Sequence, residues 1–271
     1  MASFRTGNSA FGAPGLEPSW TRGDKDGIGT AYSASSRLWF TLWNGIVTEV
    51  YHPTVDRPQI RDLQFLISDG ETFLHQETKH LHTQIKRVDG VLAYEVEEQE
   101  PGGLYSLEKI VLADPHQPCL LVHTRFRASA QASKELKVYV LCAPHLEVGG
   151  RANSGYVLEM ASGCRVLVGR KDNMWLALMA TQPFTRTSAG FVGASDGFTD
   201  LSDGFRMKWE FDRAEGGDIA LTGEIPMEGV SEFTVGLAFG DTLQHVLTTL
   251  HQCKRVIFPS GVWGDVGLTM S

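Results

Sequence analysis

Short runs of hydrophobic residues, bounded by turn residues, recur along the chain from residue 38 to residue 239. In Val91–Glu97 apolar and acidic positions alternate towards the end of the run, as on a sheet with one wet face. Roughly fifteen segments meet the criteria for strands. The clearest runs, rich in β-branched and aromatic residues, are Leu38–Leu42, Gly45–Val50, Leu63–Ile67, Tyr105–Leu112, Cys119–Phe126, Leu136–Leu141, Met174–Ala180, Phe205–Phe211, Ile219–Ile225 and Phe233–Phe239.

One segment near the C-terminus predicts a helix instead. Leu243, Val246, Leu247 and Leu250 follow the spacing of one helical face, and Asp241 or Thr242 can cap it. The short connections between the strands favour antiparallel pairing, because parallel strands need crossover helices. The pattern therefore predicts an all-β fold, a large antiparallel β-sandwich with one short C-terminal helix.

The same pattern divides the chain into four parts. Residues 1–30 are rich in Gly, Pro and polar residues and predict an irregular N-terminal arm. Residues 31–240 form the predicted sandwich, and residues 241–251 form a linker helix leading out of it. Residues 252–271 show no clear period and are left unplaced.

Composition narrows the function. With 42% hydrophobic residues in a chain of 271, there is enough apolar material for one large β domain. The net charge is -8 and Lys and Arg are scattered, which argues against a nucleic-acid partner. No apolar run is long enough for a membrane span, and the first residues lack a signal-peptide pattern, so we expect a cytoplasmic protein without a membrane partner.

The sequence predicts no metal site and no cofactor. Cys119, Cys142, Cys164 and Cys253 are far apart, so we expect buried free thiols rather than a zinc or redox motif. His80 and His82 would share one strand face as a surface pair without a third ligand nearby. Three acids in the stretch Asp196–Asp203 could hold a hard cation, although a turn-rich loop is the commoner meaning of that composition.

Candidate catalytic carboxylates also have plainer interpretations. Glu95 and Glu97 fall on one strand face, which favours a solvated surface over a catalytic pair. His145 and Glu147 form the nearest local acid–base pair, but alternation alone shows no cleft around them. No catalytic residue is assigned in this chain.

The segment between Trp43 and Asp62 carries the strongest candidate site. It places aromatic rings beside planar Arg, Asp and amide groups, which suits sugar recognition by stacking and hydrogen bonding. The plainer interpretation is a rigid corner held by an internal Arg–Asp pair, and a corner of that kind can also support a site on another domain. The carbohydrate-binding or domain-docking candidates are Trp43, Tyr51, Asp56, Arg57, Arg61 and Asp62.

This loop and its flanks resemble the N-terminal domain of bacterial and archaeal glucoamylases and glucodextranases, in glycoside hydrolase family fifteen. The similarity covers about residues 10–251. The stretches that carry it are Ala10–Gly15, Lys25–Tyr32, Ser35–Thr41, Glu49–Gln59, Ser195–Gly197 and Trp209–Ala214.

The resemblance implies a supersandwich similar to that of galactose mutarotase, followed in the family by an (α/α)6 barrel that holds both catalytic glutamates. Nothing in this chain corresponds to that barrel. The resemblance thus implies a non-catalytic domain that supports a helical catalytic domain and contacts α-glucan at most weakly. A stand-alone sugar enzyme of the mutarotase or epimerase type, and an isolated module that self-associates, are the alternatives.

Overall fold

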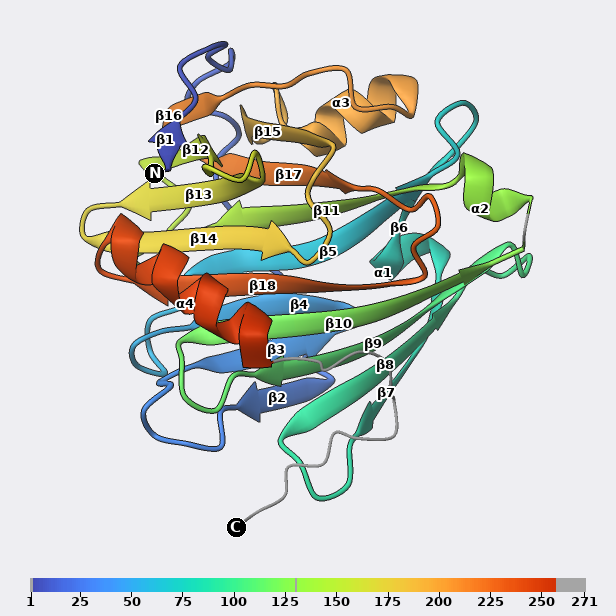
Figure 1. Ribbon diagram of the computed structural model, residues 1–271, viewed down its shortest axis with the longest axis horizontal. Helices are drawn as coiled ribbons and strands as arrows, with labels where there is room; N and C mark the ends of the chain where they lie inside the picture. The colour runs from blue at the N-terminus through green and yellow to red at the C-terminus, as the bar shows by residue number, and fades with distance from the viewer. Residues whose placement is uncertain (1, 130, 257–271) are drawn as a thin grey trace.

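Two antiparallel sheets stack face to face in the computed structural model, which describes residues 2–129 and 131–256 (Figure 1). The larger sheet has ten strands in the order β1-β12-β13-β14-β18-β10-β9-β8-β7, with β16 paired to β12. Its strands are β1 (Ser3–Phe4), β7 (His82–Arg87), β8 (Ala93–Gln99), β9 (Tyr105–Ala113), β10 (Cys119–Ala128), β12 (Asn153–Glu159), β13 (Arg165–Lys171), β14 (Met174–Ala180), β16 (Arg213–Gly217) and β18 (Glu232–Gly240).

The smaller sheet has eight strands in the order β15-β17-β11-β5-β4-β3-β2, with β6 paired to β5. Its strands are β2 (Gly27–Thr30), β3 (Trp39–Trp43), β4 (Ile46–Tyr51), β5 (Ile60–Ser68), β6 (Leu74–Gln76), β11 (Lys137–Pro144), β15 (Arg186–Phe191) and β17 (Ile219–Ile225). The predicted all-β antiparallel sandwich is therefore confirmed.

The core lies between the two sheets. Phe65 of β5 meets Phe233 of β18 edge to face, with ring centroids 5.5 Å apart, and Phe40 of β3 meets Tyr94 of β8 at 6.3 Å. Each pair joins one sheet to the other. Strand alternation supplies this core, because residues of one parity face inwards on every strand.

One polar cluster is sealed in this core. The ammonium of Lys109 on β9 contacts Glu77 of α1 (Glu77–His80), and lies 2.7 Å from a carboxylate oxygen of Glu98 on β8. It also donates to the carbonyl of Gly45 at 2.8 Å. All three charged side chains are at least 97% buried, and burial together with Glu77 raises the pKa of Glu98 well above its usual value.

The predicted C-terminal helix is present and longer than expected. Helix α4 (Leu243–Val256) begins after Thr242, whose hydroxyl accepts from the N–H of His245 at 3.1 Å. It lies across the outer face of the larger sheet (Figure 1). Its buried residues pack against Cys119, Ala177 and Ala238 of the strands below; they are Val246, Leu250 and Cys253. The rest of the predicted tail, residues 257–271, is outside the described residues.

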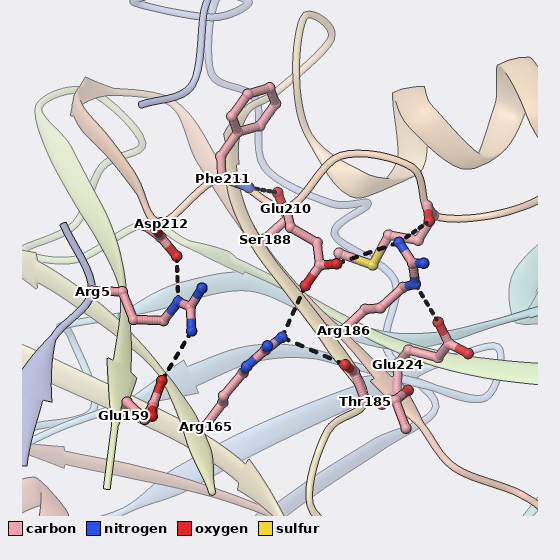
Figure 2. A network of polar contacts seen from close by, with 11 residues as sticks. Arg5, Glu159, Arg165, Thr185, Arg186, Ser188, Glu210, Phe211, Asp212 and Glu224 are labelled. Atoms are coloured by element: carbon pink, nitrogen blue, oxygen red, sulfur yellow. Dashed lines mark hydrogen bonds and ion pairs between the residues drawn. The ribbon is translucent and has the colours of Figure 1, made fainter. Parts of the chain in front are cut away.

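The N-terminal arm contains two strands that the sequence did not predict. Strand β1 pairs with β12, and β2 forms the edge of the smaller sheet beside β3. An ion-pair network holds the start of the arm (Figure 2): Arg5 reaches Asp212 at 2.7 Å and Glu159 at 2.9 Å. Gly and polar residues concealed these short strands, because their pairing depends on distant partners.

The strand predicted at Phe205–Phe211 is wrong. A helix that the sequence did not predict, α3 (Gly197–Gly204), ends there, and Phe205 adopts a left-handed conformation at its C-terminus. The buried carboxylate of Asp200 then accepts from the N–H groups of Lys208 and Trp209, at 2.6 and 2.7 Å. These bonds hold the segment in an irregular course instead of a ladder.

Asp196 and Asp200 in this region accept hydrogen bonds from backbone N–H groups. Asp196 caps α3 by accepting from the N–H groups of Phe198 and Thr199. No group of three or more potential metal ligands exists among residues 2–129 and 131–256. The loop expected at Asp196–Asp203 is thus a capped helix.

The histidine pair also differs from expectation. His80 belongs to the one-turn helix α1 and His82 begins β7, so the two rings do not share a strand face. His80 instead stacks on His75, with ring centroids 4.9 Å apart. The second one-turn helix is α2 (Ala132–Glu135).

The four cysteines are free thiols, as predicted. Cys119, Cys142 and Cys253 are buried, whereas Cys164 is half-buried. Burial raises the pKa of the Cys142 thiol well above its usual value. In the described part of the chain, no helix is both long and apolar enough to cross a membrane.

Candidate functional site

Six connections meet at one end of the sandwich, on the left in Figure 1, and enclose an open cavity of about 670 Å³. They are the β2–β3, β4–β5, β9–β10, β11–β12, β13–β14 and β18–α4 connections. We call this cavity the polar groove. Its lining is Ser35, Ser36, Arg37, His52, Pro53, Arg57, His116, Gln117, Pro118, Glu147, Asp172, Asn173, Met174, Gly240, Asp241 and His245.

An ion pair crosses one wall of the polar groove. Arg57, from the β4–β5 loop, contacts the carboxylate of Glu147 from the β11–β12 loop, and both side chains are partly exposed. Buried Gln59 fixes the two loops: its amide nitrogen donates to the carbonyl of His52 at 2.6 Å, and its oxygen accepts from the N–H of Glu147 at 2.9 Å. The pair is therefore held on a rigid base.

His52 forms part of the floor. Its ring stacks on Phe239 with centroids 6.0 Å apart, and its Nδ1 lies 3.0 Å from the carbonyl oxygen of Arg37. Burial, with the nearby charges of His245 and Arg37, lowers the pKa of His52. We therefore expect a neutral imidazole here at neutral pH.

Left-handed backbone is concentrated at this end. Arg37, Glu147 and Asp172 line the groove with φ of 47°, 51° and 50°, and Val148, next to Glu147, has φ of 61°. A β-branched residue rarely adopts this conformation, which is strained and persists only where the surroundings enforce it. Yet Val148 is 50% exposed.

Several polar groups in the groove have no partner among the described residues. Across residues 2–129 and 131–256, no hydrogen bond or ion pair involves the side chains of Arg37, His116 and Asn173. Their donors and acceptors can therefore bond to a ligand or to a partner domain at this end of the sandwich.

Of the six residues predicted as a site, only Arg57 lines the polar groove. Tyr51 ends β4 beside Pro58, and burial and Glu49 raise its pKa. Asp56 is exposed at the loop tip, where a hydrogen bond from Thr54 lowers its pKa.

The other three residues lie elsewhere. Trp43 is at the opposite end of the β3–β4 hairpin, with the guanidinium of Arg22 5.8 Å from its ring centroid. Arg61 and Asp62 stand next to each other on β5 and form an ion pair at 2.5 Å, with Asp62 buried. Asp62 also holds the pKa of Arg61 above its usual value. That ion pair joins two neighbours on one strand and does not span the corner, so the rigid-corner interpretation stays a prediction.

His145 and Glu147 do not converge. His145 is 1% exposed, with its Nε2 3.4 Å from Asp218 and its ring 4.7 Å from that of Trp20. Glu147 instead faces Arg57. Strand β11 ends at Pro144, so the alternation that placed the two residues on one face no longer applies.

Sequence reasoning missed most of the groove. Arg37, Glu147, Asp172 and His245 come from connections far apart in the chain and carry no shared local motif. The one available signal was turn composition, as in Asp172-Asn173 between two strands.

The fold places the chain among the large two-sheet antiparallel β-sandwich domains. The structure resembles part of an inverting mannosidase of family GH92 from Bacteroides thetaiotaomicron, with a TM-score of 0.50, 8% identity, and coverage of 82% of this chain and 30% of that one. At that identity the likeness concerns the fold alone.

Closer relatives define the family. The family model described as glucodextranase, domain N, matches residues 10–259, so the chain belongs to this family. A glucoamylase of Clostridium sp. (strain G0005) is 32% identical over 235 residues, which cover 86% of this chain and 33% of that protein. A bacterial glucoamylase crystallised with acarbose superposes with a TM-score of 0.90 and 30% identity, covering 94% of this chain and 38% of that one.

The chain thus spans about a third of the length of these glucoamylases. It corresponds to the N-terminal domain of a glucoamylase-type enzyme.

Proposed function

We propose that this chain is a non-catalytic domain that supports the helical catalytic domain of a glucoamylase-type α-glucan hydrolase, and that the polar groove end is its docking surface. The family match and the partial coverage of the glucoamylases support the first part. The features of the groove end support the second.

Val148 is the observation that carries the docking proposal. Its strained backbone is not offset by burial within the chain, because the residue is half-exposed. A docked domain would cover this valine. Val55 on the β4–β5 loop is also exposed, at 61%, so two apolar side chains accompany the Arg57–Glu147 pair.

This combination of exposed apolar and charged side chains suits an interface between domains. Such interfaces combine apolar contacts with polar and charged groups, and are more polar than permanent subunit contacts. The polar groove supplies charges of both signs, and Gln59 holds the two loops that carry Arg57 and Glu147 in place. A partner would meet a preformed surface.

Carbohydrate binding is the second candidate function. The polar groove offers planar donors and acceptors from Arg37, Arg57 and Asn173, but none of the described residues lining it is Phe, Tyr or Trp. Sugar recognition gains much of its energy from aromatic faces. This end therefore suits docking better than sugar binding.

Docking can be tested in trans with the Clostridium glucoamylase from which the matching third has been removed. We expect the chain to bind that protein, measured by biolayer interferometry, and Arg57→Glu to weaken binding by about tenfold or more through repulsion with Glu147. Arg206→Glu is the matched control, because Arg206 forms an exposed pair with Glu71 away from the groove. Equal losses in both variants, or no binding by the wild type, would contradict the proposal.

A further inference from the structure

A second groove lies where strand β2, at the edge of the smaller sheet, meets the β7–β8 hairpin of the larger sheet. Its volume is about 610 Å³, and His116 is the only described residue that it shares with the polar groove. We call it the tyrosine groove. It is lined by Ile28, Gly29, Thr30, Tyr32, Arg87, Val88, Gly90, Val91, Leu92, Ala93, Tyr94, Pro115 and His116.

Tyr94 is fixed in the wall of this groove. Its hydroxyl accepts from the N–H of Ile28 at 3.2 Å and donates to the carbonyl of the same residue at 3.0 Å. Its ring meets Phe40 edge to face and lies against Gly27, where an added Cβ would come within 2.8 Å of the ring. The tyrosine is therefore held in one orientation before any ligand arrives.

The same two hydrogen bonds close the edge of β2 at Ile28. An exposed edge strand pairs with another chain through its free N–H and C=O groups. At Ile28 both groups already bond to Tyr94. This argues against a partner that would extend the sheet at that point.

The mouth of the groove is apolar and open. Ile28 is 71% exposed, Tyr32 68% and Leu92 47%. Their combined surface can pack against the C–H faces of a pyranose ring, and the Tyr32 ring supplies a flat aromatic face for stacking.

The polar groups of the groove complement that surface. The guanidinium of Arg87 and the imidazole of His116 have no hydrogen bond or ion pair within the described residues. No carboxylate belongs to the described lining. Unpaired planar donors beside aromatic rings match the hydroxyls of a neutral sugar.

We propose that the tyrosine groove binds a short α-glucan, with Tyr32 stacking on a glucosyl ring and Arg87 and His116 bonding to its hydroxyls. The choice of an α-glucan over other neutral oligosaccharides rests on the proposed function. The groove itself is separate from the docking surface except at His116.

Isothermal titration calorimetry of the full chain with maltoheptaose and with isomaltoheptaose tests this site. We expect saturable binding of at least one ligand, weakened about tenfold by Tyr32→Ala, because that change removes the stacking face. Arg87→Ala is expected to weaken binding several-fold. Leu104→Ala and Lys86→Ala are controls: both side chains are exposed, lie outside the groove, and are expected to leave binding unchanged.

Three outcomes would overturn the proposal. They are the absence of saturable heat with both glucans, binding that Tyr32→Ala and Arg87→Ala leave intact, and a dimer in light scattering that Leu92→Asp dissociates, which would assign the groove to a second copy of the chain. Failure of docking in the trans assay would leave glucan binding in this groove unaffected, so the two proposals fail separately.

Discussion

At the scale of single residues, Val148 is expected to affect docking to a partner domain more than the stability of the isolated chain. Its backbone is left-handed, at φ 61°, and the residue is half-exposed next to Glu147, which contacts Arg57. Glycine adopts such a backbone without steric cost. The identity of this residue can therefore be varied without disturbing the core.

Val148→Gly is expected to leave the isolated chain as stable as the wild type or about 1 kcal/mol more stable, because relief of strain outweighs the added flexibility of glycine in the unfolded state. Docking should weaken. Val55→Gly is the matched control, since Val55 is also exposed but has no left-handed backbone, and this change should destabilise the chain slightly. Equilibrium unfolding in urea measures the stability of both variants. A clear loss of stability in Val148→Gly would show that the strain interpretation is wrong.

Lys109 carries a positive charge that is buried in the core between Glu77 and Glu98. Lys109→Met would leave Glu77 and Glu98 buried without their cation, so we expect a loss of about 3–5 kcal/mol in the free energy of unfolding. Lys86→Met removes the exposed partner of Glu97 and should change it by less than about 0.5 kcal/mol. A loss of under about 1 kcal/mol in Lys109→Met would mean that the cluster is not electrostatically coupled.

Glu98 also predicts a pH dependence. Because its pKa is raised well above 4.5 in the folded chain, the folded state holds this proton more tightly than the unfolded state. Its stabilising contribution is thus complete below pH 4.5 and is lost as the pH rises towards the folded pKa. Glu98→Gln imitates the protonated form, so its unfolding free energy should fall less between pH 5 and 8 than that of the wild type.

The difference between the wild type and Glu98→Gln isolates Glu98, because the histidines titrate in both proteins.

Asp69 acts in the opposite sense. Hydrogen bonds from Thr72, Glu71 and Phe73 outweigh its partial burial and lower its pKa from 3.8 to about 2. Its contribution is present above pH 3.8 and disappears only as the pH falls towards 2, outside the window tested. Parallel pH profiles for the wild type and Glu98→Gln would contradict the assignment of the proton to Glu98.

At the scale of elements, local pattern identified most of the long strands. Strands β14 and β17 begin and end where the sequence predicted, because their apolar runs are bounded by turn residues. Strands β12 and β13 were missed because Asn, Ser, Gly and Arg interrupt their patterns. At Phe205–Phe211 the apolar pattern resembled a strand, but bonds to the distant Asp200 decided the outcome.

The candidate site was less accessible to sequence reasoning than the fold. The β4–β5 loop was identified from its own composition, and Arg57 with it. Its partner Glu147 is 90 positions away, and the left-handed conformations of Arg37 and Asp172 depend on the assembled loops. Contacts between distant loops leave no periodic signal in a single sequence.

The packing of helix α4 on the larger sheet is expected to contribute to the stability of the domain. Leu250 is 3% exposed, against Ala238 and its neighbours on the larger sheet, so Leu250→Ala should cost about 2–5 kcal/mol through the lost contacts and the cavity. Leu247→Ala on the same helix removes a half-buried side chain and should cost clearly less. Thermal unfolding ranks the two. A melting temperature of Leu250→Ala equal to that of the wild type would mean that packing of α4 does not stabilise the sandwich.

At the scale of the whole molecule, the two grooves give the domain two separate surfaces. The polar groove gathers strained loops and paired charges at one end of the sandwich. The tyrosine groove gathers aromatic and aliphatic side chains at the edge where the sheets meet. A single domain could in this way hold a catalytic partner and contact its polysaccharide at different places.

The central claim, that the polar groove end supports a helical catalytic domain, is tested most directly by hydrogen–deuterium exchange. The chain would be measured alone and with the Clostridium glucoamylase that lacks its matching third. We predict new protection in the loops that carry Arg37, Arg57, Val148 and Asp172, with none in the β3–β4 hairpin at the opposite end. Binding that protects another face and leaves these loops unchanged would contradict the account.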